Sequence, residues 1–395
     1  MFTYRKHAGD ACEIRDLYSF KEDSVFSSHL TIRRLLGLVV TAVLAGVAPA
    51  AAQVTPAAGY TPPDDTPAIK VGVTIFADYT YQQQPKIIDA ANNSVSLSQF
   101  QVGRSYINVT GNISHNIAFR ITPDITRETG VGSSLNGSYT FRLKYAYAQW
   151  NLDDHMTKGS WARFGLQQTP YLDYSEGIYR YRFQGTIFAE REGFLSSSDA
   201  GASFHYNLPG NYGDFHAGVY NGETYAKPEV NNEKGWMFRG TVRPLGRASQ
   251  PALRGLRVTG FIDHDMYLKS APRRRGIVAI TYEHPYLNAS FEYLTVKNQP
   301  LPTATAVNAR GWSAWVTPKS TKGWEGLLRY DHLVPDRTMT TQTRERTIAG
   351  IAYWFPHQGA VSTALLLDVD NAKFNNFTTA QPTQRKIAVH ALVNF

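Results

Sequence analysis

The chain has 395 residues, enough for two ordinary domains or one large β domain, and a formal net charge of +8. Its single cysteine excludes a disulfide scaffold. Tyrosine and phenylalanine are abundant, with 23 and 20 copies, while the mean hydropathy of the chain is slightly polar, and this combination favours a structure with one polar and one apolar face. A modest positive excess predicts anionic partners only where it is concentrated.

Residues 1–52 are predicted to be a signal peptide with an N-terminal extension. An apolar run at 35–48 follows two arginines and precedes three alanines, which is typical of a secretory signal cleaved before Gln53. The run is too short for a transmembrane helix, which needs about 20 residues. The first thirty residues are long and of mixed charge for such a leader, so we expect the true start to lie downstream of Met1. The Pro-rich stretch 53–69 is then a periplasmic linker.

From residue 70 onward, apolar and polar side chains alternate with a period of two. In the first such segment Val71, Val73 and Ile75 share one face and Thr74 lies on the other, which is the pattern of a strand with one apolar face. The whole set predicts sixteen strands, at 70–81, 99–113, 117–126, 139–152, 161–168, 200–208, 212–221, 236–243, 254–264, 275–284, 287–297, 311–317, 323–332, 347–355, 361–369 and 385–395.

The connections between these segments alternate in length. If the first is assigned to the outside, nearly every second connection is a tight turn, whereas the others are long. This alternation is typical of an outer-membrane barrel with both termini in the periplasm. Strands that cross hydrocarbon must close into a barrel to pair their backbone groups. We therefore predict an all-β fold, a transmembrane antiparallel β-barrel of about sixteen strands over residues 70–395, against the alternative of a soluble secreted β domain.

The longest connection, at 169–199, is about thirty residues long, and such loops are usually functional. It contains six aromatic residues from Tyr171 to Phe188 and a cluster of charged ones: Arg180, Arg182, Arg191, Asp173, Glu176, Glu190 and Glu192. We predict that this loop folds into the lumen and narrows the pore, with these seven residues at the constriction where solutes bind. Two interpretations of the arginines stay open. Either they attract anions, or they pair with the loop's own carboxylates and hold it against the barrel.

Basic residues in the predicted strands are candidates for the lumen lining. A charge at the middle of a membrane must face the lumen, because facing lipid costs about 2–4 kcal/mol. The candidates are Arg104, Arg120, Arg142, Lys144, Arg163, Arg239 and Arg243.

Several motifs resemble one porin family. The last segment, 385–395, ends in Phe395 and is similar to the terminal strand recognised by the barrel-assembly machinery of Gram-negative bacteria. The sequence also resembles the phosphate-selective porin O and P family, at RSYINVTG (104–111), RFG (163–165), VYNGE (219–223), VRPL (242–245), GLRV (255–258) and RYD (329–331). The resemblance implies a sixteen-stranded, trimeric porin whose third extracellular loop enters the channel, and arginines that select phosphate there. The acidic residues beside the loop arginines depart from that pattern.

The predicted function is an outer-membrane porin for passive diffusion of small hydrophilic solutes or inorganic anions, and not an enzyme. The alternatives are an adhesin or receptor that uses its long outer loops, and a barrel hydrolase built on His205, His216, His264, His332 or His390. Motifs for a cofactor or a metal are absent, and we expect neither. Outer-membrane lipid and lipopolysaccharide are expected partners, the latter at the run 273–275 of three arginines; nucleic acid is not.

Overall fold

The computed structural model describes residues 65–357 and 361–395, and the predicted signal peptide lies outside the described residues. Within the described ranges the chain forms sixteen strands, as predicted. The first eight are β1 (Ala68–Ile88), β2 (Ser94–Asn112), β3 (Ile117–Arg127), β4 (Tyr139–Asn151), β5 (Trp161–Gln168), β6 (Ser198–Asn207), β7 (Gly213–Tyr220) and β8 (Gly235–Val242). The second eight are β9 (Leu256–Leu268), β10 (Ala271–His284), β11 (Leu287–Asn298), β12 (Val307–Pro318), β13 (Trp324–Val334), β14 (Thr343–Trp354), β15 (Ser362–Asn375) and β16 (Gln384–Asn394).

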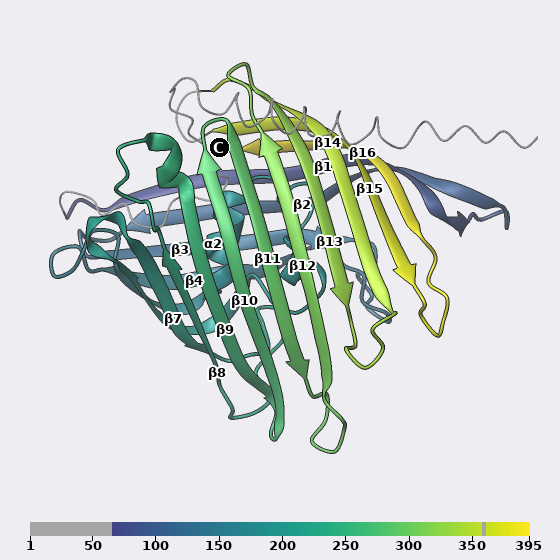
Figure 1. The fold of residues 1–395 in the computed structure, drawn as a ribbon, viewed down its shortest axis with the longest axis horizontal. Helices are drawn as coiled ribbons and strands as arrows, with labels where there is room; N and C mark the ends of the chain where they lie inside the picture. Colours follow the sequence, from purple (N-terminus) through teal and green to yellow (C-terminus); the bar gives the residue numbers. More distant parts are fainter. Residues whose placement is uncertain (1–64, 358–360) are drawn as a thin grey trace, which may run out of the picture. The chain divides into compact units, whose positions relative to one another are not determined.

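The strands form one closed antiparallel barrel in chain order (Figure 1). β1 closes the ring by pairing with β16, with Thr74 opposite Asn394 and Tyr81 opposite Ile387. Closure leaves no free sheet edge, so backbone donors and acceptors are paired within the ring. The predicted all-β barrel is therefore confirmed.

The period of two in the sequence becomes the inner and outer faces of the barrel. On β10, Ile277 and Ala279 are buried, whereas Val278 and Ile280 between them are exposed. Side chains on a strand alternate between the two faces of the sheet, so the exposed apolar residues lie on the outer surface. An apolar exterior over a polar, partly filled interior is the arrangement expected of a barrel in a membrane.

Two predicted outer loops are wrong, because they are mostly strand. Residues 82–98 were expected to be a loop, but β1 continues to Ile88 and β2 begins at Ser94. Likewise β9 and β10 run through most of 265–274, and only a short turn separates them. The glutamine run 82–84 is polar on both faces, and consecutive arginines follow Pro272 on β10, so the apolar alternation that predicts a strand is interrupted. The change matters for the three arginines at 273–275, which lie on β10 and not in a loop.

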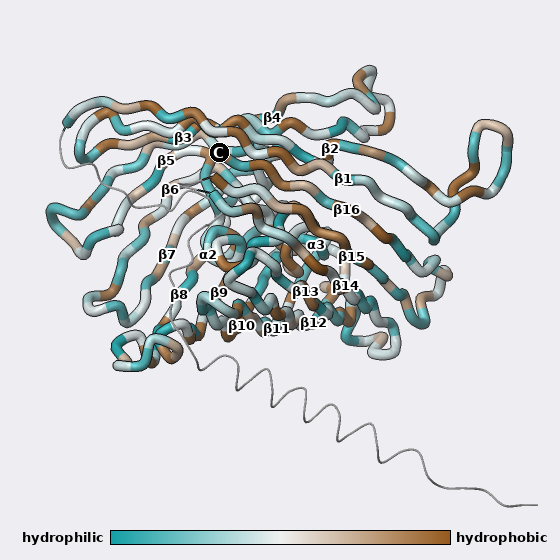
Figure 2. The backbone as a smooth tube through the Cα atoms, turned by 90° about the horizontal axis from the view of Figure 1, so that it is seen from above, coloured by the Kyte–Doolittle hydropathy of each residue, from teal (hydrophilic) through white to brown (hydrophobic). Residues whose placement is uncertain are grey.

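The long connection between β5 and β6 folds inside the ring, as predicted (Figure 2). We call residues 169–197 the inner segment. It contains two helices, α2 (Pro170–Ile178) and α3 (Phe188–Arg191). Pro170 at the first turn of α2 and Asp173 within that turn suit a helix start, since proline lacks a donor that would be unpaired there and a carboxylate favours the positive end of the helix dipole.

In the part of the chain that the structure describes, no helix has both the length and the apolar composition needed to cross a membrane.

Candidate pore and its constriction

Strands β10–β14 form the surface to which the inner segment is attached, and we call them the anchoring wall. Arg180 donates to Glu325 on β13 at 2.7 Å, and the hydroxyl of Tyr181 donates to the same carboxylate at 3.0 Å. The guanidinium of Arg329, also on β13, donates to the carbonyl oxygen of Thr186 at 2.9 Å. Since Arg329 also forms two hydrogen bonds with Asp331 at 2.8 Å, the backbone of the segment is tied to a buried ion pair.

Aromatic packing adds to these polar contacts. Tyr179 packs against Trp315 on β12, with ring centroids 5.2 Å apart, and Tyr181 packs edge-on against Trp354 on β14 at 5.9 Å. Tyr179, Tyr181 and Phe188 are almost completely buried. Burying one such side chain stabilises the docked segment by about 1.5–3 kcal/mol, so several rings hold it firmly in place.

The three loop arginines singled out in the sequence all have partners. Arg180 binds Glu325, and Arg182 lies between Glu176 at 2.7 Å and Glu190 at 3.2 Å. Arg191 donates to Gln184 and lies 3.9 Å from Asp331. All three side chains keep only 10–14% of their surface exposed. The geometry therefore favours the interpretation in which they hold the segment; whether they also filter solutes stays a prediction.

Burial and local charge set the protonation of this cluster in opposite directions. Burial raises the pKa of Glu190 above its usual value, although Arg182 counteracts part of the effect. Burial also acts on Glu176, but Arg182 and Lys144 outweigh it and hold the pKa of Glu176 below its usual value. Burial, together with nearby Arg329 and Arg346, lowers the pKa of Arg191 to about 10. The positive charge of Arg182 thus offsets the repulsion between the neighbouring carboxylates of Glu176 and Glu190.

The other two predicted constriction residues bind the barrel as well. Asp173 lies 3.7 Å from Arg163 on β5, and Glu192 lies 3.1 Å from Arg344 on β14. The seven loop residues are therefore not one ring around an opening. They form contacts on several sides of the inner segment.

Most predicted lumen-lining residues do face the interior. Arg104 and Arg142 share the buried carboxylate of Asp124, at 3.5 and 2.9 Å, and Lys144 donates to the hydroxyl of Tyr106 at 3.2 Å. The remaining inward ones are tied to neighbouring groups: Arg120 to Asn108, Arg163 to Gln149, and Arg239 to Asp214.

Arg243 was expected in a strand and is not. It lies one residue beyond the end of β8, where it donates to Asn211 at 2.7 Å. Proline cannot donate to a strand ladder, and Pro244 follows directly, so the strand stops before Arg243. The run 273–275 also differs from expectation, because Arg273 and Arg275 pair with Asp265 and Asp263 inside the barrel.

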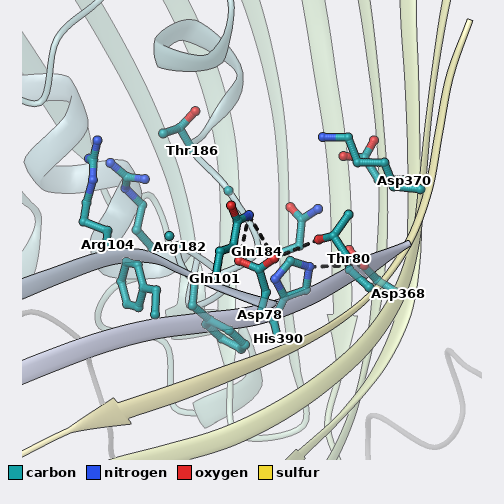
Figure 3. Close-up of a pocket in the computed structure, with 16 residues that line it drawn as sticks. Asp78, Thr80, Gln101, Arg104, Arg182, Gln184, Thr186, Asp368, Asp370 and His390 are labelled. Carbon is teal, nitrogen blue, oxygen red and sulfur yellow. Dashed lines mark hydrogen bonds and ion pairs between the residues drawn. The ribbon is translucent and has the colours of Figure 1, made fainter. Parts of the chain in front are cut away.

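An open cavity of about 270 Å³ lies on the opposite side of the inner segment from the anchoring wall. It is bounded by the tip of the segment, residues 182–186, and by β1, β2, β15 and β16, which we call the open wall. Figure 3 shows its polar lining, which includes Arg104, Arg182, Asp78, Asp368, Asp370 and His390.

Sequence reasoning missed the acidic part of this lining. Asp368 and Asp370 alternate with the exposed Leu367 and Val369 on β15, so the same inside–outside rule that selected the arginines could have selected them. Lys386 and His390 on β16 also line the cavity.

The histidines named for the hydrolase alternative have other partners. His205 contacts the carbonyl oxygen of Gly159 and the carboxylate of Asp214, both at 3.1 Å, and His390 lies 3.3 Å from Asp368. His216 is buried beside Trp161. Among the described residues, no group of three or more His, Cys, Asp or Glu side chains is arranged to hold a metal ion.

Comparison with known proteins gave no matching family model and no matching curated protein, so the resemblance to the phosphate-selective porins O and P stays a prediction. Solved structures do match. An anion-selective porin from Comamonas acidovorans has a TM-score of 0.57 at 11% identity, with 84% of this chain and 100% of that chain covered.

The chain has a porin fold. OmpF of Salmonella typhi, in complex with daunomycin, matches with a TM-score of 0.56 at 11% identity, over 83% of this chain and 97% of that one. A trimer form of OmpT, an outer-membrane protein of Vibrio cholerae, matches with a TM-score of 0.52 at 11% identity, over 84% of this chain and 100% of that chain.

Proposed function

We propose that this chain is an outer-membrane porin through which small hydrophilic solutes and ions diffuse passively, with a weak preference for anions. The observation that carries the proposal is the polar cavity between the tip of the inner segment and the open wall. An attached segment that leaves a gap on one side narrows a channel without closing it, and selection then depends on the size and charge of that gap. Proposed localisation in the outer membrane rests on the porin fold together with the predicted signal peptide.

Charge on the lining limits how strong the anion preference can be. Three cationic residues, Arg104, Arg182 and Lys386, face three anionic ones, Asp78, Asp368 and Asp370, among the described residues of the cavity. Arg182 is already neutralised by two carboxylates. Support for an anion preference comes from Arg104, which keeps 22% of its side chain exposed, and from the fold it shares with an anion-selective porin. Strict selection of phosphate has no such support.

We further propose a homotrimer, because one matching structure is a trimer form and the outer face of the barrel is apolar. Phe395 pairs with Val73 of β1 through backbone hydrogen bonds of 3.0 and 3.1 Å. The residue that we propose as the signal for the barrel-assembly machinery therefore also takes part in closing the barrel. Contact with lipopolysaccharide would involve the outward Arg274, since its two neighbours face inward.

The decisive experiment is the reversal potential of the purified chain in a planar bilayer under a KCl gradient, repeated with phosphate. We expect an ion current, a modest anion preference in KCl and no large increase with phosphate. Absence of any current from correctly folded protein would contradict the porin proposal.

A second arm changes Arg180 and Arg182 together to alanine. Because both arginines are paired with carboxylates, we expect altered conductance from a loosened segment and a shift toward cations from the freed carboxylates. Unchanged selectivity and conductance would show that the inner segment does not bound the pore.

A further inference from the structure

Carboxylates inside the barrel are usually paired with arginine. Asp214 pairs with Arg239, Asp370 with Arg346, and Glu325 with Arg180. The same holds for further buried pairs: Asp124 with Arg142, Asp263 with Arg275, and Asp331 with Arg329. Such pairing is expected, since a buried charge without a partner is costly.

Asp78 and Asp368 depart from this pattern. Within the described residues neither carboxylate lies within 4.0 Å of a lysine or arginine nitrogen. Asp78 accepts hydrogen bonds from the uncharged Thr80 and Gln101, at 2.8 and 3.0 Å. Asp368 is 2% exposed, and neither of its carboxylate oxygens accepts a hydrogen bond. Both line the cavity of the open wall.

His390 links the two carboxylates across three neighbouring strands. Asp78 on β1 is directly opposite His390 on β16, and the Nε2 atom of His390 lies 3.3 Å from Asp368 on β15. Side chains opposite one another on the same face of paired strands are about 4.5–5.5 Å apart at Cβ. Figure 3 shows the three side chains together, with dashed lines joining His390 to Asp368 and Asp78 to Thr80 and Gln101.

Asp78, His390 and Asp368 together offer more hydrogen-bond acceptors than donors. A neutral imidazole has one donor, and the Nδ1 atom of His390 has no hydrogen-bond partner, so His390 alone leaves most of the acceptor capacity of Asp368 unused. The tip of the inner segment contributes the uncharged Gln184 and Thr186 to the same cavity. An ammonium group has three donors, which matches two carboxylates and a free imidazole nitrogen. Among the described residues no group of three or more His, Cys, Asp or Glu side chains could hold a metal ion here.

We propose that Asp78 and Asp368, with His390 between them, bind the primary ammonium group of a small solute inside the pore. This inference rests on the proposed channel function and adds a solute class to it. Asp78 and Asp368 lie at one end of the cavity, which Lys386 also lines, whereas Arg104 lies toward the other end in Figure 3. A channel with a weak overall anion preference would then still retain amines at one position.

The test is block of the single-channel current of the full chain by 1,4-diaminobutane, with the uncharged 1,4-butanediol as the reference solute. The variant changes Asp78→Asn and Asp368→Asn together, which keeps the side-chain volumes and removes both charges. Charge-assisted hydrogen bonds are strong enough that we expect the half-blocking concentration of diaminobutane to rise about tenfold or more. Block by butanediol is expected to be weak and equal in both proteins.

Glu345→Gln is the matched control. Its neighbours Arg344 and Arg346 contact Glu192 and Asp370 inside the barrel, so alternation places Glu345 on the outer face. The Glu345→Gln substitution removes a carboxylate that does not line the cavity. We expect diaminobutane to block this variant at the same concentration as the wild type. Equal block in wild type and double variant, or an equal loss in Glu345→Gln, overturns the proposal.

A second measurement does not depend on conduction. Titration calorimetry of diaminobutane into detergent-solubilised full chain is expected to give binding heat with wild type and little with Asp78→Asn alone, a half-buried position where an amide can keep the hydrogen bond from Thr80. Equal heats would contradict the site. If the chain conducts ions but does not bind diaminobutane, only the amine-site proposal is wrong. If it binds diaminobutane but does not conduct ions, the channel proposal is wrong.

Discussion

On the anchoring wall, Glu325 binds Arg180 of the inner segment. Asp331 binds Arg329, which also donates to the backbone of the segment. On the open wall, Asp78 and Asp368 face a cavity, and neither lies beside a lysine or arginine among the described residues. Both surfaces are strands of one barrel with charged residues pointing inward. The difference is whether the inner segment covers them. Where it does, charge and aromatic packing fix a structure; where it does not, two carboxylates are left without a lysine or arginine partner among the described residues.

The largest expected effect comes from removing a charge of the anchoring wall. Arg329→Met leaves the buried Asp331 without its main partner and frees the carbonyl oxygen of Thr186, so we expect a loss of about 3–5 kcal/mol in the free energy of unfolding. Chemical unfolding in detergent micelles measures it. Arg346→Met removes a more exposed pair, which joins β14 to Asp370 of the open wall, and should cost clearly less. Equal losses would show that the two walls do not differ as described.

A glycine on the anchoring wall tests the packing without changing charge. A Cβ atom at Gly311 would lie 2.6 Å from the ring of Phe188 and 2.6 Å from the carbonyl oxygen of His332. We expect Gly311→Ala to displace the inner segment, lower stability by about 1–3 kcal/mol and raise the single-channel conductance. Gly260→Ala is the control, since nothing lies within 4 Å of its Cβ position. Wild-type conductance in Gly311→Ala would argue against Phe188 as an anchor.

A smaller effect is expected from one cation of the open wall. Lys386 lines the cavity, so Lys386→Gln should shift the permeability ratio toward cations by roughly twofold, on the order of 0.5 kcal/mol, and less at high salt. Lys297→Gln removes the same charge from an exposed position on β11 and should leave the ratio unchanged. The reversal potential at two salt concentrations measures both. A shift of the same size in both variants would mean that the lining does not set selectivity.

The smallest effect concerns the connection between β7 and β8, away from both walls. Burial, with nearby Glu229 and Asp265, raises the pKa of Glu223 to about 7, from 4.5. A carboxyl group with a raised pKa in the folded state favours that state when protonated, so local stability should fall as pH rises from about 4.5 to about 7 and stay flat above it.

Hydrogen-exchange protection factors of residues 221–234 at pH 5 and pH 8 measure this dependence, which we expect to be no more than roughly tenfold. Glu223→Gln should remove it, whereas Glu233→Gln on the same connection should keep it. A pH dependence that survives Glu223→Gln would assign it to another group.

Most of the fold could be predicted from the sequence because the signal is local. At β5 the predicted and observed bounds coincide, since an alternating segment there is bounded by polar residues and by Pro170. Prediction failed at 82–98 and 265–274, where strands continue although the apolar alternation is interrupted. Backbone hydrogen bonds to the neighbouring strand keep these residues in a strand, and an apolar face is not needed for that.

The candidate site was predictable only in part. The length and aromatic content of 169–199 indicated a segment folded into the lumen, and the structure places it there. The sequence does not decide between the two roles of its arginines, because it does not show which strand each one meets. Glu325 and Asp331, which bind Arg180 and Arg191, lie on β13, far along the chain.

The sequence by itself determined which side chains face inward, because residues on a strand alternate between its two faces. It therefore contained the inward positions of Asp78, Asp368 and His390. Which inward charges meet a partner was decided by the tertiary structure alone. That outcome depends on ring closure between β1 and β16, which brings the two ends of the barrel sequence side by side, and on which wall the inner segment covers. Both are contacts between distant parts of the chain, to which a local pattern is insensitive.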